Sequence, residues 1–66
     1  MKQNYKGFEI ETHQDSLGRW HATVTDNDAG MTLATTPKDE NYGTDMEQQA
    51  VYAARALIER TLAKGY

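Results

Sequence analysis

The chain has 66 residues, no cysteine and a net charge of −3, with seven lysines and arginines against ten aspartates and glutamates. A chain of this length forms one small domain, residues 1–66, and the lack of cysteine excludes disulfides, cysteine-ligated zinc and thiol catalysis. Phosphate contacts supply most of the affinity of nucleic-acid binders, so the acidic balance argues against that class. No apolar run has the length of a signal peptide or a membrane span, and we expect a cytoplasmic protein.

Three stretches in the first half alternate apolar and polar residues with a period of two, as half-buried strands do. They cover residues 6–12, 19–25 and 31–35. Short connections between them favour an antiparallel meander. Their apolar positions share one predicted core face, and these are Phe8, Ile10, Trp20, Ala22, Val24, Met31 and Leu33.

The second half changes to helical periodicity over residues 44–64. The apolar stripe of this predicted helix comprises Val51, Ala54, Leu57, Ile58 and Leu62. Thr44 and Glu47 fit a capping box at its start, and Gly65 stands where a C-terminal glycine cap belongs. A helix of about twenty residues is longer than a small sheet is wide, so we expect one end to project.

The predicted fold is therefore α+β, a three-stranded antiparallel meander with one C-terminal helix packed on one face, in the order β-β-β-α. Residues 36–43, which include the only proline, connect the sheet to the helix. The opposite face of the sheet is polar and is expected to be uncovered. We interpret it as a partner surface formed by Glu9, Glu11, His21, Thr23 and Thr25.

Two groups of residues in the strands and their turns have a chemical interpretation. Residues 26–30 resemble the start of an EF-hand calcium loop, which needs glycine at its sixth position and glutamate at its twelfth. Counted from Asp26, the glycine is fifth and the twelfth residue is Pro37, so an ordinary hairpin turn is favoured. His21 and Glu9 or Glu11 would form an acid–base pair if the strand register placed them together. We favour a solvated cross-strand contact over such a pair.

The remaining candidates are single residues. Ser16, the only serine, lies in a turn with no base positioned by the sequence, and the glycines form no phosphate-binding motif. The tyrosines, Tyr5, Tyr42, Tyr52 and Tyr66, lie outside the core pattern and are candidates for interface contacts. We therefore predict no catalytic residues, no cofactor, no metal site and no enzymatic activity.

Three segments together resemble the HicB-like domain of bacterial antitoxins. They are residues 5–8 (Tyr-Lys-Gly-Phe), the second strand after Gly18, and residues 43–47 (Gly-Thr-Asp-Met-Glu) at the start of the helix. The chain is also similar to several small bacterial domains of unknown function with the same plan. The HicB-like resemblance implies a dimer or tetramer whose acidic domain occludes a basic RNA-cleaving toxin.

The function hypotheses belong to different classes. The first is a small protein-interaction or regulatory module, acting as a homodimer and binding a basic partner protein. The second is a nucleic-acid module, since the order β-β-β-α is also similar to the double-stranded RNA-binding plan. The third is a domain of uncharacterised role without catalytic activity.

Overall fold

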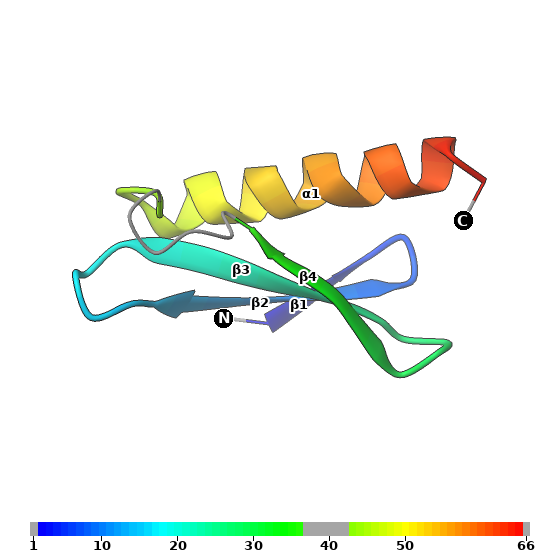
Figure 1. Cartoon of the computed structure of the whole chain (residues 1–66), viewed down its shortest axis with the longest axis horizontal. Helices are drawn as coiled ribbons and strands as arrows, with labels where there is room; N and C mark the ends of the chain where they lie inside the picture. Colours follow the sequence, from blue (N-terminus) through cyan, green and yellow to red (C-terminus); the bar gives the residue numbers. More distant parts are fainter. Residues whose placement is uncertain (1, 37–42, 66) are drawn as a thin grey trace.

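The computed structural model describes residues 2–36 and 43–65, which form a four-stranded antiparallel sheet and one C-terminal helix. The strands lie in the order β1-β2-β3-β4, and α1 lies across one face of the sheet (Figure 1). The elements are β1 (Lys2–Tyr5), β2 (Phe8–Gln14), β3 (Trp20–Asp26), β4 (Met31–Thr36) and α1 (Glu47–Ala63). The α+β class and the C-terminal helix are confirmed. Most of the predicted connection at 36–43 and the tyrosines Tyr42 and Tyr66 lie outside the described residues.

The prediction of three strands is wrong, because the first residues form an additional edge strand. β1 pairs with β2 through a two-residue turn, with Tyr5 opposite Phe8. Lys6 and Gly7 both have positive φ, 51° and 86°, as the type I′ hairpin turn requires. Lys6 is therefore a turn residue and not the start of a strand.

The core lies between α1 and the apolar face of β2 and β3. Its buried members are Phe8, Ile10, Ala22, Val24, Ala50, Val51, Ala54 and Ile58. Trp20, Leu33 and Leu57 are half-buried against it, so the predicted core face is confirmed at these positions. Leu62 near the end of α1 is 38% exposed, which agrees with a projecting helix end.

The prediction that Met31 belongs to the core is wrong, since its side chain is 62% exposed. It pairs with Asp26 in the β3–β4 hairpin, which points away from α1 in Figure 1. A register shift follows between Val24 and Thr25, so that Thr32 lies opposite Thr25 while Ala34 lies opposite Val24. Met31 stays on the α1 side of the sheet, because its partner Asp26 also pairs with the core residue Phe8, so its exposure follows from the hairpin leaving α1 and not from the bulge at Leu33.

The predicted capping box of Thr44 and Glu47 is also wrong. α1 begins at Glu47, with Met46 as N-cap, and the Met46 N–H donates to Gln49 Oε1 at 3.3 Å. Thr44 is instead held extended by two backbone hydrogen bonds to Trp20, at 2.8 and 2.9 Å. At the other end the prediction is confirmed: Gly65 has a φ of 79° and its N–H donates to the Leu62 carbonyl.

Candidate functional site

The strand register brings four of the five predicted partner residues together on the face of the sheet opposite α1. Glu9 lies opposite Thr25, and Glu11 lies opposite Thr23. No described element covers this side of the sheet (Figure 1). The bulge adds Thr32 and Thr35 of β4, which pair with Thr25 and Thr23. We call the surface formed by these residues, Glu9, Glu11, Thr23, Thr25, Thr32 and Thr35, the open face.

The open face combines carboxylates with a row of short hydroxyl side chains. The Thr23 and Thr35 hydroxyls are hydrogen bonded at 3.2 Å. Lys2 Nζ lies 3.6 Å from a Glu11 carboxylate oxygen, and both side chains are at least half exposed. An ion pair this exposed contributes little to stability, so the Glu11 carboxylate can exchange Lys2 for another cation.

His21, the fifth predicted partner residue, is buried and does not belong to this surface. Only 5% of its side chain is exposed. Its Nε2 lies 2.7 Å from Asp15 Oδ2, and its ring stacks on His13 at 5.7 Å between centroids. The register places His13 opposite His21, so the predicted pairing of His21 with Glu9 or Glu11 is wrong.

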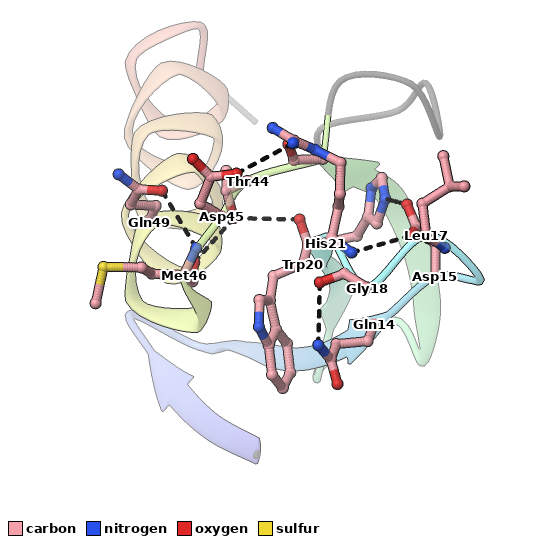
Figure 2. Close-up of polar contacts among 12 residues, drawn as sticks. Gln14, Asp15, Leu17, Gly18, Trp20, His21, Thr44, Asp45, Met46 and Gln49 are labelled. Carbon is pink, nitrogen blue, oxygen red and sulfur yellow. Dashed lines mark hydrogen bonds and ion pairs between the residues drawn. The ribbon is translucent and has the colours of Figure 1, made fainter.

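Asp15 and His21 belong to a loop cluster that also includes Arg19 and Gly43. Asp15 Oδ1 accepts the backbone N–H groups of Leu17 and Arg19, at 2.9 and 3.0 Å. The hydrogen bond with His21 is the main reason that the pKa of Asp15 lies below its ordinary value. Each oxygen of this carboxylate is thus used to hold the β2–β3 loop (Figure 2).

Arg19 joins the loop cluster to the segment that leads into α1. Its Nε donates to the Gly43 carbonyl at 2.5 Å, and its Nη1 lies 3.1 Å from Asp45 Oδ1. The Trp20–Thr44 bridge lies beside these contacts in Figure 2. The burial of His21 and the number of its contacts favour a structural role over proton transfer.

A second polar cluster, which the sequence patterns did not reveal, joins the β1–β2 turn to α1. Tyr5 Oη and Lys6 Nζ both donate to Glu59 Oε2, at 2.5 and 2.6 Å. The bond from Lys6, followed by that from Tyr5, lowers the pKa of Glu59. Hydrogen bonding to Glu59 in turn raises the pKa of Tyr5 and of Lys6. Local sequence patterns could not predict this cluster, because Glu59 is more than fifty positions away from both partners.

The other predicted candidates occupy ordinary structural positions. Asp26 Oδ1 accepts the N–H groups of Asp28 and Ala29, and the Gly30 N–H donates to the Asp26 carbonyl, which confirms the hairpin turn. Ser16 is exposed in the β2–β3 loop. Within residues 2–36 and 43–65, no three histidine, aspartate or glutamate side chains gather as metal ligands, and no helix is long and apolar enough to cross a membrane.

Comparisons with known proteins found no relative of this chain. No family model, no curated protein and no solved structure matches it.

Proposed function

We propose that this chain is a protein-interaction module whose open face binds a basic partner protein. The observation that carries the proposal is the register of β2 and β3, which sets Glu9 and Glu11 on one uncovered face beside the threonines. Carboxylates on this face attract lysine and arginine side chains and lower the affinity for polyphosphates. No catalytic step forms part of the proposal.

The threonines make this face suitable for a protein surface. Their β-branched side chains have few rotamers, so ordering them on binding costs little conformational entropy. The four strands have 4, 7, 7 and 6 residues, which at about 3.3 Å per residue and about 4.8 Å between strands give a face of roughly 400 Å². A standard interface buries about 800 Å² on each partner, so we expect micromolar affinity unless neighbouring residues also contribute.

The resemblance to the HicB-like domain supports the same proposal. If the chain is such a domain, the basic partner is an RNA-cleaving toxin, and the open face occludes part of its basic surface. The nucleic-acid alternative predicts binding of duplex RNA that weakens as salt increases.

The experiment is a titration of ¹⁵N-labelled protein with a lysine decapeptide, followed by NMR at low and high salt. We expect salt-sensitive shifts of the Glu9, Glu11 and Thr23 amides, with small changes along α1. Shifts confined to α1 would overturn the proposal, as would tighter binding to duplex RNA than to the peptide.

A charge-matched pair of variants localises the effect. Glu9→Lys should weaken peptide binding about fivefold, which corresponds to roughly 1 kcal/mol. Asp28→Lys makes the same change in net charge at the exposed tip of the β3–β4 hairpin, outside the open face, and should have less than about half that effect, because its side chain does not contact a peptide bound at Glu9 and Glu11. Equal weakening by both variants would show that only net charge matters.

We also propose that the chain forms a homodimer through the outer edge of β4. This strand is last in the sheet order, and Met31–Thr36 has no charged residue or proline to discourage pairing. Sedimentation at micromolar concentration should give a species of twice the 7.5 kDa chain mass. Thr32→Lys should convert it to a monomer, because a symmetric pair would bring two lysines together. A monomeric native chain would overturn this proposal.

A further inference from the structure

A pocket of about 290 Å³ lies between β1 and the first half of α1, on the helix side of the sheet. It is lined by Gln3, Glu47, Gln48, Val51, Tyr52 and Arg55. Val51 is buried and supplies an apolar floor, whereas the other lining side chains are polar or amphipathic. The size is near the lower end for ligand pockets and suits a molecule of about ten non-hydrogen atoms.

One end of the pocket carries a positive charge held in a fixed position. The Arg55 guanidinium carbon lies 5.3 Å from the ring centre of Tyr5 and 5.9 Å from that of Tyr52. Its Nη2 donates to Gln3 Oε1 at 3.2 Å. Its Nε is buried and has no hydrogen-bond partner among the described residues. The guanidinium carries five N–H donors and the bond to Gln3 uses one of them, so Arg55 has donor capacity beyond the buried Nε for a ligand carboxylate.

The other end carries a negative charge, from Glu47. Its Oε2 accepts a hydrogen bond from the Thr12 hydroxyl at 2.5 Å, which positions the carboxylate. Between the two ends, Gln48 Nε2 donates to the Tyr52 hydroxyl at 2.8 Å. The hydroxyl of Tyr52 accepts this bond and keeps its own proton to donate. The pocket thus offers donors at one end and a carboxylate at the other.

We propose that this pocket binds a small zwitterion of the amino-acid and short-peptide class, with its carboxylate at Arg55 and its ammonium group at Glu47. Glu47 would repel a simple anion, and Arg55 would repel a simple cation. Only a ligand with both charges is therefore complementary to both ends of the pocket. The site lies on the opposite side of the sheet from the open face, and the proposal does not depend on the proposed function.

The spacing of the two charges selects the ligand length. Glu47 and Arg55 are eight positions apart, so their Cα atoms are about 12 Å apart along α1. Both side chains line the same pocket and helical side chains lean in the same direction, so we take about 12 Å as the separation of the charged ends. Two charge-assisted hydrogen bonds of ~2.8 Å leave about 6 Å for the ligand. An extended dipeptide, at ~3.6 Å per residue, separates its termini by about this distance.

The test uses three ligands that differ in charge and have nearly the same shape: glycylglycine, N-propionylglycine, in which a methyl group replaces the ammonium group, and glycylglycinamide. NMR titrations at constant ionic strength follow the Arg55 Nε–H and the Gln48 and Tyr52 amides. We expect saturable shifts of these signals with glycylglycine and at least tenfold weaker binding of the two singly charged ligands. Equal affinity for all three ligands, or shifts mapping elsewhere, would overturn the proposal.

Conservative variants test the ammonium end and the middle of the pocket. Glu47→Gln keeps an acceptor for Thr12 and removes the charge, so it should abolish the preference for glycylglycine over N-propionylglycine. Tyr52→Phe keeps the ring beside Arg55 and should weaken glycylglycine binding about threefold, the loss of one modest hydrogen bond. Arg60→Gln, a control in the last turn of α1, should bind as the native chain does. A preference that survives in Glu47→Gln would overturn the assignment of the ammonium end.

Discussion

Replacing Gly43 by alanine tests whether the loop cluster is as tightly packed as its geometry indicates. A Cβ at this position would lie 2.7 Å from Arg19 Cβ and 2.7 Å from His21 Nε2. Both atoms are constrained, because the Arg19 Cβ moves only with the backbone directly before β3 and the imidazole of His21 is buried against Asp15. Something in the cluster must therefore shift to admit the methyl group.

The expected change in the free energy of unfolding is the difference between two effects. Overpacking of this kind costs about 1–3 kcal/mol. Replacing glycine by alanine also stabilises by about 0.4–1 kcal/mol, because it reduces the freedom of the unfolded chain. The net destabilisation is about 1–2 kcal/mol, a large part of the roughly 3–5 kcal/mol that a domain of this size has. The melting temperature should fall by about 5–15 °C.

Urea unfolding followed by tryptophan fluorescence measures this difference, because Trp20 lies next to the cluster and is the only tryptophan. Ser16→Ala in the same loop is the control and should change the free energy of unfolding by less than about 0.5 kcal/mol. A Gly43→Ala chain as stable as the native one would show that the close packing of Gly43 against Arg19 and His21 does not constrain the fold.

Three other changes follow from the same structure. Ile58→Ala, at a fully buried core position, should reduce the free energy of unfolding by about 2–5 kcal/mol in urea; a loss below about 1 kcal/mol would contradict the core assignment. Gly7→Ala should destabilise by about 1 kcal/mol in thermal melts, since alanine must adopt the φ of 86°, and no loss would refute the type I′ turn. The lowered pKa values of Asp15 and Glu59 mean that both carboxylates stabilise the fold above about pH 4 and lose this effect as the pH falls through their folded values. Asp15→Asn should therefore show a shallower loss of stability between about pH 5 and 2 than the native chain, and superimposable profiles would contradict the His21 bond.

Local periodicity was sufficient to predict β2, β3, α1 and the layer between them. Ile10, Val24 and Ile58 follow the periods of two and 3.6 residues, and each side chain faces the core. These patterns are reliable where one face of an element is buried along its whole length. The glycine at position 65 is predictable for the same reason, because its role depends only on the turn of helix before it.

β1 was missed because its sequence, Lys-Gln-Asn-Tyr, has no apolar alternation. The signal that could have revealed it is the dipeptide Lys6-Gly7. A two-residue connection with glycine in second place is typical of a β-hairpin turn, and such a turn requires a strand on each side. Gln3 faces α1 and contacts it through a polar group, whereas Tyr5 both donates to Glu59 and packs its ring against the core. An edge strand anchored in this way leaves almost no hydrophobic pattern.

The candidate site was predictable only where it depends on alternation. Glu9, Glu11, Thr23 and Thr25 share a face, as their spacing indicates. His21 alternates with Thr23 and Thr25 along β3 and so belongs to the same face by its spacing. It is nevertheless buried, because Asp15 and Gly43 lie against its ring. Gly43 is twenty-two positions away, and nothing in the local pattern specifies that contact.

The bulge in β4 connects the fold to the proposed binding surface. With strict alternation, Thr32 and Ala34 would share one face, and Leu33 and Thr35 would share the other. The register shift places Thr32 and Thr35 together on the open face and turns Ala34 toward α1. The open face therefore gains a second threonine beside Thr23, and the helix meets a small side chain that permits close packing. One irregular residue thus determines the composition of both faces of this strand, which is why we expect the bulge to be as important for partner binding as Glu9 and Glu11.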